Sequence, residues 1–258
     1  MREEVNKNFN HLKVHTQYSV CEGTVKIETL KDFCKKNNIK SVGLSDTSNL
    51  SGALEFSENL SKAGTQPIIG TQIFFKYNGI YGLLPLIALD QKGYKKIIEL
   101  SSKSYLENDS LSEPHCKFEE LLTCNEGIVI LSGSINGLIG KLFNKGRLNE
   151  IEKIYAELNQ KYKNNFYIEI QRHGDENEKF FENFNLLNSK KFNIPIIASH
   201  EVFYLDKSMY EAHDALTCIS KKTYVNEKNR IKLSDQHYFK SSEEMKELFS
   251  DLPEALQN

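Results

Sequence analysis

The amino-acid sequence predicts an α/β fold, because short apolar segments alternate with segments of helical periodicity over most of its 258 residues. Several apolar segments, among them 127–132 and 195–199, are almost uninterrupted, which is typical of strands buried on both faces of a parallel sheet. So many strand–helix units in one domain favour a closed or nearly closed barrel over an open sheet. We expect this barrel to occupy residues 1–205, and a helical extension to occupy residues 206–258.

The first half of the chain is expected to run strand, helix, strand, helix, strand, strand. Thr24 is the expected N-cap of the first helix, because its hydroxyl precedes a run of helical periodicity. The last two strands, 67–75 and 83–89, are expected to form a hairpin through a turn at Asn78-Gly79.

The second half is expected to add helices and three more strands. A polar loop is expected at 108–114, and 202–205 is expected to open a helix. Two capping boxes, Ser208-x-x-Glu211 and Ser241-x-x-Glu244, are expected to start helices in the extension. Helical spacing predicts that the following apolar side chains face inward: Ile98, Tyr105, Phe180, Leu187, Ile219, Met245 and Phe249.

Composition excludes several classes of protein. The formal net charge of -2 provides no overall attraction to a phosphate backbone, so any contact with nucleic acid must be local. The chain has no apolar run as long as a membrane span, and Met1–Lys7 lacks the apolar core of a signal peptide. We therefore expect a cytoplasmic protein that does not contact the membrane. Its five cysteines include no C-x-x-C pair and are expected to be reduced.

The chemistry is expected where the first strand ends. His11, Lys13 and His15 alternate along this strand, so their side chains share one face. Only neighbours such as 13 and 15 lie close enough to share a metal ion. A histidine at position 13 would complete a His-x-His pair, but a protonated lysine has no lone pair for a metal.

These residues, with others along the whole chain, resemble the PHP (polymerase and histidinol phosphatase) domain in the form found in the bacterial DNA polymerase III α subunit. The resemblance is carried by His11-Leu-x-x-His15-Thr-x-Tyr-Ser19, Leu44-Ser-Asp46-x-x-Asn49-Leu50, Gln66-Pro-Ile-Ile-Gly70, Phe166-Tyr-Ile-Glu-Ile-Gln-Arg-His173-Gly174, Ala212-His213-Asp214 and Glu243-Glu-Met-x-Glu-Leu-Phe-x-Asp-Leu-Pro-Glu-Ala-Leu256. It implies a distorted (β/α)7 PHP barrel with a C-terminal helical extension.

In members that bind metal, the resemblance implies a cluster of histidines and carboxylates that acts in phosphoester or exonuclease chemistry. Carried over position by position, this sequence departs from that pattern repeatedly. The corresponding positions are Lys13, His15, Glu22, Asp46, Thr47, Gln72, Leu83, Ser134, Glu201 and Phe203. Only His15, Glu22, Asp46 and Glu201 could still be ligands. We therefore expect neither a metal nor a catalytic residue in this chain.

A charge argument gives this site a structural role. A lysine ammonium about 4 Å from a metal ion would be repelled by several kcal/mol at an effective dielectric constant near 20. We expect Lys13 to replace the lost cation and to neutralise Glu22, Asp46 or Glu201.

The resemblance implies a non-catalytic domain that supports a polymerase and docks other proteins. The implied partners are the rest of the α subunit, the proofreading exonuclease subunit and other replisome proteins, with DNA contacted only through the full-length protein. Magnesium is implied for the polymerase core, which lies outside this chain.

The alternative is a metal-dependent PHP phosphoesterase or exonuclease with a reduced ligand set. Its ligands would be His15, Glu22, Asp46, His173, His200 and Glu201. Against it, His173 and His200 are expected to be hydrogen-bonded structural histidines, and His213 is expected to pack within a helix. A direct DNA-binding module has little support, because no basic patch with interleaved aromatic residues is present.

Overall fold

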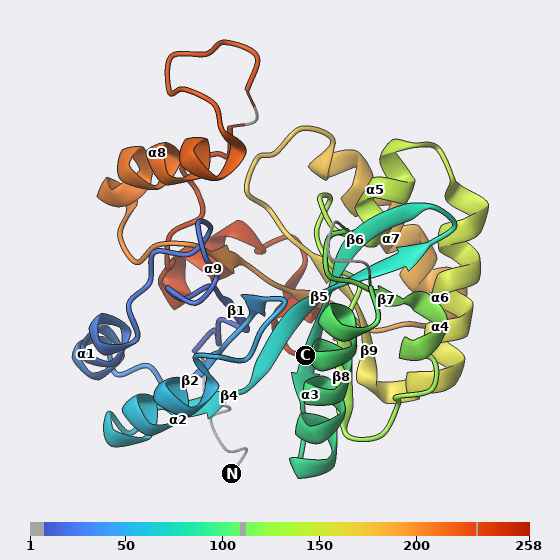
Figure 1. Cartoon of the computed structure of the whole chain (residues 1–258), viewed down its shortest axis with the longest axis horizontal. Coiled ribbons are helices and arrows are strands. Elements are labelled where there is room, and N and C mark those ends of the chain that lie inside the picture. Colours follow the sequence, from blue (N-terminus) through green and yellow to red (C-terminus); the bar gives the residue numbers. More distant parts are fainter. Residues whose placement is uncertain (1–7, 109–111, 231) are drawn as a thin grey trace.

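The computed structural model describes residues 8–108, 112–230 and 232–258 (Figure 1). The expectation about a signal peptide at Met1–Lys7 lies outside the described residues, as does the middle of the polar loop expected at 108–114. No helix in the described part of the chain is long and apolar enough to cross a bilayer.

A mixed sheet of seven strands forms the centre of the molecule. Its strands are β3 (Asp46–Thr47), β5 (Gly70–Tyr77), β6 (Ile80–Ala88), β7 (Cys116–Lys117), β8 (Ile128–Leu131), β9 (Phe166–Ile170) and β10 (Ile196–Ala198). They are arranged in the order β10-β9-β8-β6-β5-β3, and β7 also pairs with β5. The β5–β6 and β6–β8 pairs are antiparallel, and the other pairs are parallel.

Two small parallel sheets complete the strand set. One contains β1 (Lys13–Val14) and β11 (Glu201–Val202), and the other contains β2 (Ser41–Gly43) and β4 (Gln66–Ile68). A single bridge between Val14 and Leu44 connects the two. The α/β class is confirmed, but the expected distorted (β/α)7 barrel is not, because the strand pairing of the described residues is divided among three sheets and the main sheet is not closed. The hairpin is one physical reason, since it inserts antiparallel pairs into the sheet.

The hairpin and its turn are as predicted, but the expected strand 67–75 is divided into β4, which pairs with β2, and β5, which forms the hairpin. β5 and β6 pair from Gly70–Ile87 to Tyr77–Ile80, and Asn78 and Gly79 between them have φ of 44° and 80°. Two positive φ angles make the tight turn that Asn-Gly favours.

Helices cover the sheets on several sides (Figure 1). They are α1 (Ile27–Asn37), α2 (Ala53–Lys62), α3 (Gln91–Leu106), α4 (Phe118–Leu121), α5 (Leu138–Asn144), α6 (Leu148–Tyr162), α7 (Glu178–Phe192), α8 (Tyr210–Lys221) and α9 (Ser242–Leu248), with 3₁₀ turns η1 (Lys163–Asn165), η2 (Lys207–Met209) and η3 (Pro253–Leu256). In the figure, α1 and α2 lie on one side of the molecule and α4 to α7 on the other.

The apolar side chains form two main cores. The larger one joins the main sheet to α3, α5 and α6, and it also takes in Met245 and Phe249 of the C-terminal segment. The smaller one joins Val14 of β1 and Val202 of β11 to α1 and α2. The boundary expected at residue 206 stays a prediction.

Several local predictions were wrong. The chain at 202–205 continues strand β11 and then coil rather than a helix. Helix α1 begins at Ile27, and the Thr24 hydroxyl donates to the Phe203 carbonyl instead of capping it. Ser208 lies in η2 and does not cap α8, whereas the capping box of Ser241 and Glu244 is present. The following side chains, expected inside, are exposed: Ile98, Tyr105, Phe180, Leu187 and Ile219.

Candidate functional site

A buried lysine lies at the junction of three strands. Parallel pairing of β1 with β11 sets Lys13 opposite Glu201, and β9 brings Glu169 to the same point. The Lys13 Nζ lies 3.0 Å from Glu201 Oε1 and 3.2 Å from Glu169 Oε1. These contacts are ion pairs whose angles fall outside hydrogen-bond geometry. The Lys13 ammonium thus faces two carboxylates.

The charge states of this group follow from burial and pairing. Burial alone would lower the pKa of Lys13, but Glu169 and Glu201 outweigh it and raise that pKa. Burial alone would raise the pKa of Glu201, yet the Lys13 ammonium and the Gln72 amide hold it well below its usual range. Lys13 is therefore an ammonium and Glu201 a carboxylate at neutral pH.

The Gln72 amide connects His15 to this pair. Its Nε2 donates to Glu201 Oε1 over 2.7 Å and contacts His15 Nε2 over 3.1 Å. Because an amide nitrogen only donates, His15 Nε2 accepts and its ring proton lies on Nδ1. The lone pair that could bind a metal is therefore already used. We call Lys13, His15, Gln72, Glu169 and Glu201 the Lys13 centre.

Asp46 lies beside this centre and binds the turn that follows His15. Its carboxylate accepts from the Thr16 backbone N–H at 2.6 Å, the Thr16 hydroxyl at 2.7 Å and the Ser19 hydroxyl at 2.8 Å. These bonds fix the turn that follows His15. Glu22 accepts a hydrogen bond from the Thr47 hydroxyl. Both carboxylates thus have partners other than Lys13.

The other positions at which the resemblance implies metal ligands provide none here. The Phe203 ring packs on the His15 ring with centroids 4.6 Å apart. Leu83 pairs with Phe74 in the hairpin, and Ser134 accepts from the Asn136 backbone N–H. Neither side chain brings a nitrogen or carboxylate ligand to the centre.

The Lys13 centre does not fit a divalent metal ion. The Lys13 ammonium lies between the two carboxylates that would attract such an ion, and at an effective dielectric constant near 20 a unit charge 4 Å away contributes about 4 kcal/mol of repulsion. Gln72 binds the His15 lone pair, and Phe203 covers the ring. The expected pairing of Lys13 with Glu201 is confirmed, whereas Glu22 and Asp46 are not its partners.

Glu169 is a member of the centre that sequence reasoning missed. It interrupts the apolar strand Phe166–Ile170, and a charged residue inside a buried strand was the available signal. Its side chain is fully buried, and its Oε1 accepts a hydrogen bond from Gln171.

A second polar group lies next to the first. The ring of His173 stacks on those of His237 and His200, with centroids 4.1 and 4.4 Å apart. His173 Nε2 accepts from the Glu201 backbone N–H, and His200 Nε2 contacts the Tyr238 carbonyl oxygen. We call these three residues the histidine stack. The bonds made by His173 and His200 agree with their expected structural role.

Burial sets the charge of this group. It lowers the pKa of His173 to about 4 and those of His200 and His237 well below the usual value. It also raises the pKa of Asp175 to about 6 and that of Glu178 to about 7. The histidines are therefore neutral at neutral pH.

The reduced ligand set of the alternative is divided between the two groups. His15 and Glu201 lie in the Lys13 centre, while His173 and His200 lie in the histidine stack. Asp46 is held by the turn at Thr16. His213 lies in α8, where its Nε2 contacts the Glu22 carbonyl oxygen at 2.8 Å.

The family of this chain follows from its comparison with known sequences. The family model of the PHP domain matches residues 11–173, which is more than half of the chain. The chain therefore belongs to the PHP domain family.

Curated relatives identify the form of the domain. The chain is 35% identical over its full length to the DNA polymerase III subunit alpha of Caulobacter vibrioides, covering 23% of that protein. It is 37% identical over 97% of its length to the same subunit of Rickettsia conorii, covering 21% of it. The chain thus spans less than a quarter of the length of these relatives.

One solved structure is similar in fold alone. An amidohydrolase from Chromobacterium violaceum superposes with a TM-score of 0.50 at 7% sequence identity, covering 75% of this chain and 87% of that one.

Proposed function

We propose that this chain is a PHP domain that has lost its catalytic metal site and supports a DNA polymerase III α subunit. The observation that carries this proposal is the position of the Lys13 ammonium, 3.0 and 3.2 Å from two buried carboxylates. A fixed positive charge at this point provides the neutralisation that carboxylates need, without any exchangeable ion.

The location of the Lys13 centre supports a structural role. Lys13 and Glu201 precede Val14 and Val202 of the smaller core, and Glu169 lies between Ile168 and Ile170 of the larger core. The ion pairs therefore connect the two cores of the domain. A rigid domain of this kind can carry the rest of a longer polypeptide.

The partners and the polymerase activity come from the relatives. The rest of the α subunit is the first proposed partner, because the chain covers under a quarter of each such relative. The proofreading exonuclease subunit and other replisome proteins are further proposed partners. Nucleotidyl transfer, its magnesium and the contact with DNA would belong to the residues beyond this chain.

A phosphoesterase assay with metal analysis tests the loss of catalysis. The purified chain is incubated with Mn²⁺ or Zn²⁺ and with a chromogenic phosphomonoester or phosphodiester. We expect the same background rate for the wild type and for His15→Ala, because His15 Nε2 is bound to Gln72. Activity that needs added metal and is lost in His15→Ala would favour the alternative enzyme.

A binding assay tests the role as a support. We expect this chain and the remaining segment of its α subunit, expressed separately, to elute together in gel filtration. Separate elution at micromolar concentrations of both would contradict the proposed support of the polymerase.

A further inference from the structure

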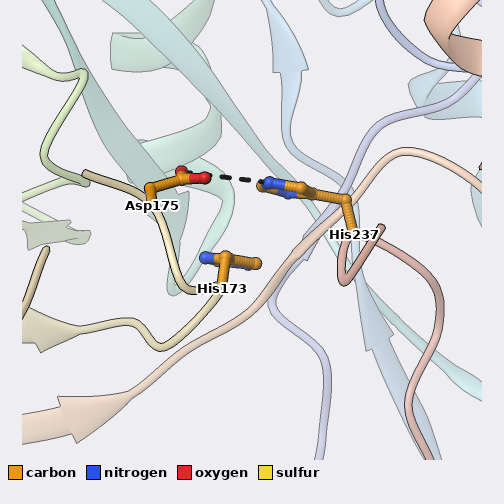
Figure 2. Close-up of side chains that lie close together, drawn as sticks. All are labelled: His173, Asp175 and His237. Atoms are coloured by element: carbon orange, nitrogen blue, oxygen red, sulfur yellow. Dashed lines mark ion pairs between the residues drawn. The ribbon is translucent and has the colours of Figure 1, made fainter. Parts of the chain in front are cut away.

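Two members of the histidine stack, His173 and His237, meet Asp175 and form a group of three possible metal ligands. Asp175 and His237 are not among the ligand positions expected from the sequence. His173 and Asp175 follow strand β9, and His237 comes from the segment before α9. One donor atom from each of the three lies within 4.8 Å of the others. Figure 2 shows the Asp175 carboxylate directed at the His237 ring, with His173 beside both.

His237 has a free lone pair in a buried position. Its Nδ1 lies 3.3 Å from the Glu201 carbonyl oxygen, which can only accept, so the ring proton is on Nδ1. Its Nε2 then carries a lone pair, and in the described part of the chain this atom has no hydrogen-bond partner. The side chain is 3% exposed. Buried polar atoms normally have a partner, so this one requires an explanation.

The surroundings of His237 suit a metal ion. A histidine that donates from one ring nitrogen to a backbone carbonyl is oriented to bind metal with the other. The Asp175 Oδ2 lies 4.0 Å from His237 Nε2. Two ligands of a tetrahedral zinc with bonds of about 2.0–2.1 Å lie roughly 3.3 Å apart, so a small side-chain rotation would bring this pair to ligand distance. An ion between these two atoms would satisfy the lone pair and the carboxylate together.

We propose that His237, Asp175 and His173 form a binding site for one late first-row divalent ion such as Zn²⁺, separate from the Lys13 centre. Imidazole nitrogens with a carboxylate are a typical ligand set for Zn²⁺. Three protein ligands leave a fourth position for water.

The stacking of the rings determines the order of binding. The rings of His173 and His237 are parallel within 6°, so one ion cannot lie in the plane of both. The ion binds first to His237 and Asp175. His173 then joins by turning out of the stack, which breaks the 3.3 Å contact of its Nδ1 with Glu178 and the hydrogen bond that its Nε2 accepts from the Glu201 backbone N–H. This rearrangement makes binding weaker than at a preformed structural zinc site.

Zinc binding by the full 258-residue chain tests the proposal. Equilibrium dialysis against Zn²⁺ alone, followed by elemental analysis, gives the stoichiometry and the affinity. We expect one ion per wild-type chain and at least tenfold weaker binding in His237→Ala and Asp175→Asn. Circular dichroism confirms that each variant is folded. His200→Asn is the matched control, since His200 stacks on His173 but lies outside the proposed ligand set.

A second control separates this proposal from the proposed function. His15→Ala removes a histidine of the Lys13 centre and is expected to bind Zn²⁺ like the wild type. If His15→Ala loses the ion while His237→Ala keeps it, the ion lies in the Lys13 centre, and both proposals fail. If the wild type binds no Zn²⁺, only the site at His237 is excluded. Absorption of bound Co²⁺ in the visible range, absent in His237→Ala, would confirm the histidine ligand directly.

Discussion

At the scale of single residues, Lys13 determines the balance of charge in the molecule's interior. Replacing it by methionine is expected to lower the unfolding free energy by about 3–5 kcal/mol, because Glu169 and Glu201 would stay buried without a counter-charge. Urea denaturation at pH 7 measures this loss. The control variant Lys13→Met/Glu169→Gln/Glu201→Gln removes all three charges and is expected to regain most of it. Equal midpoints for Lys13→Met and wild type would show that the ion pairs add nothing.

The stability of Lys13→Met is expected to depend on pH in a different way from that of the wild type. In the wild type, the depressed pKa of Glu201 provides stability that is complete above the unfolded carboxyl value of about 4.3 and is lost as the pH falls through the folded value. In Lys13→Met the sign reverses, because burial without the ammonium raises the carboxyl pKa. The stability deficit of Lys13→Met is therefore expected to be smaller at pH 4.5 than at pH 7. A deficit independent of pH would assign the loss to packing instead of charge.

At the scale of elements, the two capping boxes expected from the sequence provide a matched pair. The Ser241 hydroxyl accepts from the Glu244 backbone N–H at 3.2 Å, and the Glu244 carboxylate accepts from the Ser241 N–H at 2.7 Å. Ser241→Ala is expected to lower the free energy of unfolding by about 1 kcal/mol, because it removes the N-cap of α9, whose Met245 packs in the larger core. Ser208→Ala removes no cap of α8, so it is expected to lower the free energy of unfolding by at most a few tenths of a kcal/mol. Similar losses in urea denaturation for both would contradict this assignment.

Elements whose buried face is purely apolar were predictable from the sequence. In α6 the apolar side chains that recur at helical spacing are buried throughout: Ile151, Ile154, Tyr155, Leu158 and Tyr162. In α7 the expected face was wrong, because Asn185 lies inside and accepts a hydrogen bond from the Tyr155 hydroxyl at 2.8 Å. Three of the four buried residues of α7 are polar, so hydrophobic periodicity cannot show which face lies inside, and Phe180 is exposed.

The candidate site was predictable only in part for a similar reason. Lys13 and Glu201 occupy recognisable motif positions, and their pairing was anticipated. Asp175 and His237 lie in irregular segments, where no periodicity relates one residue to another. Their approach depends on how the segment before α9 crosses the end of β9, which is a long-range contact that spacing along the chain does not encode.

At the scale of the whole molecule, the two cores are joined through polar groups. The Lys13 centre connects strands of both cores, and the histidine stack lies against it through the bond from the Glu201 N–H to His173. The histidines of this junction are neutral, and the charges of the Lys13 centre are paired, only within a limited pH range. The stability of the domain should therefore respond to pH through its buried histidines.

The expected response is a rise in unfolding free energy between about pH 4 and pH 6.5. Burial lowers the pKa of His11 to about 4 from 6.5, and His173, His200 and His237 are lowered as well. A lowered histidine pKa means that the unfolded chain binds more protons in this range, so stability is complete above pH 6.5 and is lost as the pH falls toward 4. The raised pKa values of Asp175 and Glu178 act in the opposite direction and reduce the slope.

The variant His11→Asn tests this response. Lowering the His11 pKa from 6.5 to about 4 corresponds to on the order of 3 kcal/mol of unfolding free energy across this pH range. The His11 Nε2 contacts the Lys240 carbonyl oxygen at 2.8 Å, and an asparagine amide can also donate there without titrating. Urea denaturation at a series of pH values is expected to give a shallower rise for His11→Asn than for the wild type. Parallel curves of unfolding free energy against pH for the two proteins would show that His11 is not held neutral by burial. A wild-type unfolding free energy that falls as the pH rises would show that the raised pKa values of Asp175 and Glu178 outweigh the histidines.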